Sequence, residues 1–214
     1  MRKNRLWFIG LLVYWLIGLA GCARQEIKNI DSRGANIICF GDSVTFGYGA
    51  GPGEDYPAAL AKILAEPVFN SGIDGDTTTE ALRRLDSDVL ERDPLLVIIE
   101  FGGNDFLRKI PATVTANNVK EMVRRCQDKG AMVALADISA GLLLKEYRSA
   151  FLQIARETGS IFIPGVFGGI LTNPHLKSDF IHPNGSGYQV IAQRVYRGIL
   201  PYLNQNKLIR KYQK

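Results

Sequence analysis

The stretch Ile37-Ile38-Cys39-Phe40-Gly41-Asp42-Ser43 decides how this chain folds. Four strand-forming residues are followed by Gly-Asp, a serine, and a turn-rich segment over residues 44–49. In open α/β folds, the loops at the carboxyl ends of the strands build the functional site. The pattern therefore predicts a buried strand that presents the Ser43 hydroxyl at the carboxyl edge of a parallel sheet.

The rest of the chain alternates between strand-like and helix-like segments. We expect strands over residues 36–40, 68–70, 95–101, 131–136 and 160–163, and helices over residues 56–66, 77–92, 113–129, 145–158 and 185–203. The third strand is apolar on both faces, which is typical of the centre of a parallel sheet. This alternation, in a chain of 214 residues, predicts one α/β domain with a five-stranded parallel sheet and helices on both faces.

The first 22 residues have the features of an export signal. Residues 1–5 are basic, residues 6–20 are uncharged and apolar, and small residues follow. This apolar run of 15 residues is shorter than the roughly 20 that span a bilayer. Leu19-Ala20-Gly21-Cys22 resembles the lipobox of bacterial lipoproteins, which implies cleavage before Cys22 and a lipid anchor on that cysteine. A plain signal peptide and an uncleaved anchor remain open alternatives.

The charge distribution argues against nucleic-acid binding. The formal net charge is +5, but three positive charges lie within residues 1–5 and four within residues 207–214. The body of the chain is therefore slightly acidic, whereas a nucleic-acid-binding domain carries a basic face. Of the three cysteines, Cys39 and Cys126 are expected to behave as small buried hydrophobes. Whether these two form a disulfide stays open.

Unusual loops follow three of the predicted strands. They are Gly41-Asp42-Ser43, Asn70-Ser71-Gly72 and Gly102-Gly103-Asn104-Asp105, and a fourth block, Asp179-Phe180-Ile181-His182-Pro183, precedes the last helix. Because the carboxyl ends of parallel strands share one edge of a sheet, we expect the first three loops to lie together.

These residues suit acyl transfer. A serine hydroxyl becomes nucleophilic when a base takes its proton, and His182 is the candidate base for Ser43. Asp179, three residues upstream, is placed to orient the imidazole. The tetrahedral oxyanion needs aimed donors, and the backbone N–H groups of Ser43 and Gly72 with the side-chain amide of Asn104 are the available set.

The four blocks, in this order, resemble the motifs of the SGNH/GDSL hydrolases. The resemblance covers residues 36 to about 203. The last two blocks look most like the branch that holds arylesterases, acyl-CoA thioesterase I and lysophospholipase L1. The resemblance implies a flavodoxin-like three-layer sandwich, a triad of Ser43, Asp179 and His182, oxyanion donors from Ser43, Gly72 and Asn104, and neither metal nor cofactor. Together with the export signal and the composition of the flanking segments, it divides the chain into a signal peptide (1–21), a tether (22–35), a hydrolase domain (36–204) and a basic tail (205–214).

Some residues depart from the family pattern or have an ordinary role. Val44 replaces the leucine of the family motif, and residues 137–144 do not match the loop expected in the thioesterase branch, which leaves the acyl-chain preference open. Leu142-Leu143-Leu144 is either buried or an exposed apolar lip. We expect His175 to be a surface histidine, and Asp74 with Asp76 to be a poor calcium loop.

The sequence thus predicts an enzyme, a serine esterase that forms an acyl-serine intermediate. Its substrates would be aryl esters, short- or medium-chain esters or lysophospholipids, with thioesters as a further option. We expect a bacterial lipoprotein, exported and held to a membrane through Cys22, that faces the periplasm or the cell exterior. Two alternatives stay open: a carbohydrate O-acetyl esterase with the same triad, and a non-catalytic surface-anchored module. The oligomeric state is not predicted.

Overall fold

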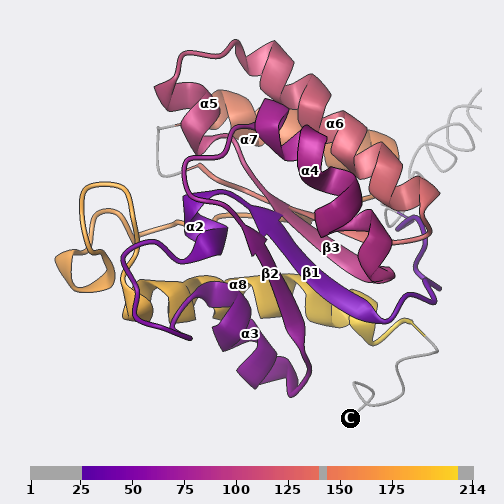
Figure 1. Ribbon diagram of the computed structural model, residues 1–214, viewed down its shortest axis with the longest axis horizontal. Coiled ribbons are helices and arrows are strands. Elements are labelled where there is room, and N and C mark those ends of the chain that lie inside the picture. The colour runs from indigo at the N-terminus through magenta and orange to yellow at the C-terminus, as the bar shows by residue number, and fades with distance from the viewer. Residues whose placement is uncertain (1–25, 140–143, 207–214) are drawn as a thin grey trace, which may run out of the picture.

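A five-stranded parallel sheet forms the centre of the protein (Figure 1). The structure is a computed structural model, and it describes residues 26–139 and 144–206. The strands follow the spatial order β2-β1-β3-β4-β5 and all pair in parallel. Their bounds are β1 (Asn36–Gly41), β2 (Val68–Gly72), β3 (Pro94–Glu100), β4 (Met132–Ala136) and β5 (Ile161–Ile163). The predicted fold is confirmed, and the strand order is that of flavodoxin-like sheets.

Helices cover both faces of this sheet (Figure 1). On one face α3 packs against α8, and on the other α6 packs against α4 and α7. The long helices are α3 (Tyr56–Leu64), α4 (Thr78–Asp88), α6 (Ala112–Asp128), α7 (Lys145–Thr158) and α8 (Gly185–Leu203). Short helical turns complete the chain: α2 (Ser43–Phe46), η1 (Leu90–Arg92), α5 (Gly103–Leu107) and η2 (Pro174–Leu176). Within the described residues, none of these helices has the length and apolar character needed to cross a membrane.

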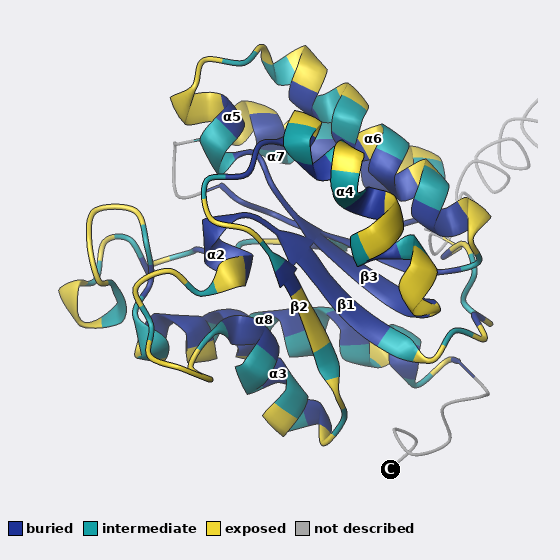
Figure 2. Cartoon of the chain, viewed as in Figure 1, coloured by how far each residue is buried: buried dark blue, intermediate teal, exposed yellow. Residues whose placement is uncertain are grey.

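Burial explains which strands hold the sheet together (Figure 2). All seven residues of β3 are buried, and so are five of the six residues of β1. By contrast, only Ser71 is buried in β2 at the sheet edge, and Phe69 and Asn70 are exposed. The strand order reverses at β1, because β2 lies on one side of it and β3 on the other. In such sheets the ligand site lies at this switch point, outside the carboxyl ends of the strands.

The helix that follows β2 is shorter than the sequence predicted. Its start is as expected, because Thr77 and Glu80 form a capping box at the beginning of α4. The α-helix then ends at Asp88, since Val89 has φ −132° and ψ −59°, outside the helical region. A 3₁₀ turn, η1, takes up the remaining residues before β3.

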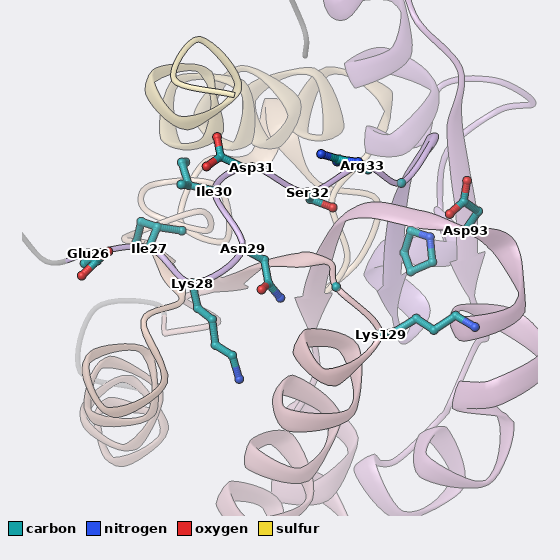
Figure 3. Close-up of a pocket in the computed structure, with 13 residues that line it drawn as sticks. Glu26, Ile27, Lys28, Asn29, Ile30, Asp31, Ser32, Arg33, Asp93 and Lys129 are labelled. Atoms are coloured by element: carbon teal, nitrogen blue, oxygen red, sulfur yellow. The ribbon is translucent and has the colours of Figure 1, made fainter. Parts of the chain in front are cut away.

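The described part of the predicted tether lies against the domain. Ile27 is buried, and the side-chain amide of Asn29 donates to the carbonyls of Gln127 and Ala131 at 2.8 and 3.0 Å. Figure 3 shows residues 26–34 beside the amino end of β3, where they line a hollow of about 800 Å³. The folded unit therefore extends upstream to Glu26, and the chain joins it at the amino-terminal edge of the sheet. The predicted signal peptide, Cys22 and residues 207–214 lie outside the described residues.

Asp105 links three helices on the carboxyl side of β3. Asp105 belongs to α5, and its side chain is fully buried. One oxygen accepts a hydrogen bond from the backbone N–H of Thr78, the first residue of α4, at 2.9 Å. The other accepts hydrogen bonds from the hydroxyls of Thr78 and of Thr115 in α6. Asp105 therefore sets where the α5 turn lies relative to the two longer helices.

We expect Asp105→Ala to lower the free energy of unfolding by about 3 kcal/mol or more, because three buried donors lose their acceptor. Urea titration followed by circular dichroism measures this. The matched control is Asp86→Ala, which removes an exposed carboxylate that pairs with Arg125 and should change stability by less than about 1 kcal/mol. Equal stability of the two variants would contradict the proposed structural role of Asp105.

Candidate active site

Ser43 lies at the carboxyl end of β1, where the strand turns directly into a helix. It is the first residue of α2, and Asp42 caps that helix by accepting a hydrogen bond from the N–H of Val44 at 3.1 Å. Gly41 makes the tight turn possible: a Cβ there would lie 2.0 Å from the Thr45 hydroxyl and 2.6 Å from the Glu100 carbonyl. The predicted connection from the strand to Ser43 is therefore a tight turn that packs α2 closely against β1 and β3.

The structure brings Ser43, His182 and Asp179 into one hydrogen-bonded chain. Nε2 of His182 lies 3.1 Å from Oγ of Ser43, and Nδ1 of His182 lies 2.8 Å from Oδ2 of Asp179. The other oxygen of Asp179 accepts the backbone N–H groups of Ile181 and His182, each at 2.8 Å. The imidazole ring also lies against Tyr48, with 4.4 Å between ring centroids.

The charge of Asp179 fixes the tautomer of the histidine. Partial desolvation raises the pKa of Asp179, but the hydrogen bonds from His182 and the two backbone N–H groups outweigh it and bring this pKa down to about 2. Asp179 is thus ionised at neutral pH and accepts a hydrogen bond from the N–H at Nδ1 of His182. That leaves Nε2 as the acceptor for the Ser43 hydroxyl, which is the arrangement a general base requires.

Asn104, predicted as an oxyanion donor, lines the same pocket as Ser43 and His182. Its side-chain amide donates one hydrogen bond to the carbonyl of Asp76, at 3.0 Å. An amide nitrogen carries two hydrogens, so the second stays available as a donor. The first bond fixes the direction in which the second N–H points.

Gly72 has a different role from the one that the sequence predicted. Its N–H already donates to Oδ1 of Asn70 at 2.9 Å. A Cβ at position 72 would lie 2.1 Å from the backbone nitrogen of Phe46, a distance that real structures do not allow. The glycine therefore lets the backbone of α2 lie against β2. The close backbone contact at this glycine is made with the protein's own helix α2.

Gly75 is a candidate donor that the sequence did not predict. It lies in the loop between β2 and α4 with φ +77°, next to Asp76, whose carbonyl holds Asn104. Within the described chain, no acceptor is found for its N–H. The signal was present in the sequence: Gly75-Asp76 comes directly before the capping residue Thr77, where a positive φ favours glycine.

An apolar pocket of about 120 Å³ opens beside Ser43. The residues that line it come from α2, β3 and α5, and from the loops after β1, β4 and β5 and before α7 and α8. Its apolar lining consists of Val44, Phe106, Leu107, Ile138, Leu144, Phe167, Leu171 and Ile181. The sequence left open whether Leu142-Leu143-Leu144 is buried or forms an exposed apolar lip. Leu144 lines the pocket, whereas Leu142 and Leu143 lie outside the described residues. The larger hollow of Figure 3 lies at the opposite edge of the sheet.

The other candidates for a chemical role have structural or surface positions instead. Asp76 pairs with Arg84 at 2.7 Å. His175 is exposed, and its backbone N–H donates to Asn173. Cys39 and Cys126 are free and buried, and burial raises the pKa of both thiols to about 12. Both cysteines are therefore neutral hydrophobes, as predicted.

Comparison with known proteins points to the same family as the motifs. The model of the GDSL-like lipase/acylhydrolase family matches residues 39–190. An arylesterase from Vibrio mimicus is 30% identical over 178 residues, which cover 78% of this chain and 89% of that protein. Esterase TesA from Pseudomonas aeruginosa is 26% identical over 196 residues, which cover 86% of this chain and 98% of that protein.

A solved structure shares the architecture. The psychrotrophic esterase EstA from Pseudoalteromonas sp., in a crystal structure inhibited by monoethylphosphonate, is similar with a TM-score of 0.71 and 29% identity. The similarity covers 79% of this chain and 98% of that chain. Because the family model spans well over half of its length and the four motif blocks occur in order, this chain belongs to the GDSL-like lipase/acylhydrolase family, the SGNH hydrolases.

Proposed function

We propose that this protein is a serine esterase that hydrolyses carboxylic esters with an acyl group longer than acetyl. The observation that supports it best is the chain of hydrogen bonds from Asp179 through His182 to Ser43, at the mouth of an apolar pocket. A carbohydrate O-acetyl esterase would need little apolar lining next to its nucleophile. The apolar side chains beside Ser43 instead suit the alkyl part of an acyl group.

In the proposed mechanism, Nε2 of His182 takes the proton of Ser43 while Oγ attacks the ester carbonyl. The oxyanion accepts hydrogen bonds from the N–H of Ser43 and the free N–H of Asn104. We propose the N–H of Gly75 as the third donor, in place of Gly72. His182 then donates its proton to the leaving alkoxide, and a water that it activates hydrolyses the acyl-serine.

The location of the protein is part of the proposal. We propose an exported lipoprotein that is anchored through Cys22, only four residues before Glu26. Glu26 lies at the amino-terminal edge of the sheet and Ser43 at the carboxyl edge, so they are at opposite ends of the strands. Four residues reach at most about 14 Å. The pocket would therefore face away from the anchoring membrane, and its esters would come from the aqueous phase or from a facing surface.

The first test is hydrolysis of p-nitrophenyl esters from C2 to C16 by wild type and by Ser43→Ala. We expect wild type to prefer chains longer than acetyl and Ser43→Ala to retain at most about a thousandth of kcat, since the nucleophile is lost. Mass spectrometry after a phosphonate inhibitor should show a single adduct on Ser43. A preference for C2 would favour the O-acetyl esterase. No hydrolysis and no adduct in folded protein would favour the non-catalytic module.

The oxyanion assignment makes a separate prediction. Asn104→Ala should lower kcat by about a hundred- to a thousand-fold with little change in KM, because its hydrogen bond strengthens only in the transition state. Steady-state kinetics on the best p-nitrophenyl ester measure this. Asn118→Ala is the matched control: Asn118 donates to two threonine hydroxyls of α4, outside the pocket, and its loss should leave kcat close to wild type. Equal kcat values for the two variants would remove Asn104 from the site.

The orientation of the anchored enzyme can be tested with an insertion. A flexible linker of about 40 residues after Gln25 would give the domain a further span of roughly 35 Å. In vesicles that carry the lipidated protein and a fluorogenic ester lipid, we expect the insertion variant to hydrolyse that lipid much faster than wild type. Both should hydrolyse a dissolved p-nitrophenyl ester equally. Rapid hydrolysis of the vesicle's own lipid by wild type would show that the pocket reaches the anchoring membrane.

A further inference from the structure

Glu100 is a buried acid that the proposed reaction does not use. It ends β3, its side chain is 4% exposed, and it lines the pocket that holds Ser43. The hydroxyl of Thr45 donates to Oε2 of Glu100 at 3.0 Å and lies 3.2 Å from the hydroxyl of Tyr56. Burial at this depth strongly favours the neutral form of a carboxyl group.

A second buried carboxyl, that of Asp42, lines the same pocket, and its negative charge and a hydrogen bond with it both raise the pKa of Glu100. Asp42 is 3% exposed, and its Oδ1 also accepts the N–H of Val44. Ionised carboxylates are acceptors only, so two carboxyl groups share a hydrogen bond only when one of them is protonated. The pair of Asp42 and Glu100 therefore holds a proton.

The surroundings place that proton on Glu100. The ionisable group that acts most on Glu100 is Asp42, and the charge of Glu100 in turn raises the pKa of Cys39, Tyr56 and Tyr188, which are neutral at neutral pH. Burial and then the charge of Asp42 raise the pKa of Glu100 well above its usual range.

The setting of Asp42 differs. Burial raises its pKa too, and the nearby acids Asp76 and Asp105 act in the same direction, but the N–H of Val44 and the imidazole of His182 favour its charged form. The pKa of Asp42 is raised only to about 7, so we take Asp42 as the more acidic member and the acceptor of the pair, with Glu100 as the donor.

We propose that Glu100, in its neutral form, is a positioning residue that holds Ser43 for attack. This inference rests on the proposed esterase function. The Glu100 O–H donates to Asp42, and its other oxygen accepts from Thr45. Asp42 and Thr45 lie on either side of Ser43 in the turn from β1 into α2. A single side chain from β3 thus fixes both ends of the turn that carries the nucleophile, without contact with the reacting atoms.

Ionisation of Glu100 would end this arrangement. The second carboxylate would have no proton to donate and would repel Asp42, so the turn would shift and misplace Ser43. Because the pKa of Glu100 is higher in the folded than in the unfolded protein, its contribution to stability is fully present below about pH 4.3 and is lost as the pH rises through the folded value. We expect kcat to fall over the same pH range in which Glu100 ionises.

Three variants test the role of Glu100. Glu100→Gln keeps a donor and an acceptor in the same shape but cannot ionise, so kcat should fall by less than about tenfold and its decline with rising pH should disappear. Glu100→Met fills the volume without hydrogen bonds, so kcat should fall by about a hundredfold with little change in KM, as for a nucleophile misplaced by about 1 Å. Thr45→Val removes the bond accepted by Glu100, together with the contact to the Tyr56 hydroxyl, and should lower kcat in the same direction if Glu100→Met does not fold.

The measurements are kcat and KM of the full chain against pH on the best p-nitrophenyl ester, with thermal unfolding as the check on folding. A kcat of Glu100→Gln as low as that of Glu100→Met would show that a carboxylate is needed and would overturn the proposal. So would wild-type kcat in folded Glu100→Met or in Thr45→Val. Infrared absorption gives a readout that is independent of activity: wild type at neutral pH should show a protonated carboxyl band that Glu100→Gln lacks. If the enzyme hydrolyses none of the esters but the band is present and lost in this variant, the esterase function fails while the protonated Glu100 stands.

Discussion

The hydrogen bond between Ser43 and His182 is the contact on which the site depends, and it joins residues 139 positions apart. One side comes from the turn after β1 and the other from the loop before α8. These two segments are held together independently of the bond itself, since the hydroxyl of Tyr188 in α8 donates to the carbonyl of Tyr48 at 2.8 Å. The close packing at Gly41 and Gly72 holds α2 on the sheet from the opposite side. The nucleophile is therefore set by packing before any substrate arrives.

Arg84 performs a related task at the ends of the first two strands. Its guanidinium donates to the carbonyls of Gly41 and Ser71 at 3.0 and 2.9 Å and to the carboxylate of Asp76. It also lies over the ring of Phe40, 4.5 Å from the centroid. The Gly41 carbonyl also accepts the N–H of Ile73 at 3.2 Å, and a buried carbonyl at a strand end is costly if it has no donor. The planar fork of arginine serves several acceptors at once, which a lysine does not.

The sequence was sufficient for the fold and for the three residues of the hydrogen-bonded chain, because both follow from local patterns. Strand-like runs that end in glycine predict the sheet, and Asp179 and His182 are only three positions apart. The role of Gly72 depends on which way its N–H points and on where α2 crosses β2, and neither is a local property. Residues 26–35 look like a polar tether because their partners, such as Gln127 for Asn29, lie about a hundred residues away.

Asp179 and Glu100, two acids near the nucleophile, take opposite charge states. Asp179 is ionised and faces the side of His182 that becomes positive when the serine proton is taken. Glu100 lies on the other side, in the pocket beside Ser43, where negative charge develops on the substrate oxygen. A second carboxylate there would oppose the oxyanion at low dielectric, so burial that keeps Glu100 neutral removes a charge from the place where it would do most harm. Two carboxyl groups of similar intrinsic acidity thus take opposite states because their environments separate their pKa values.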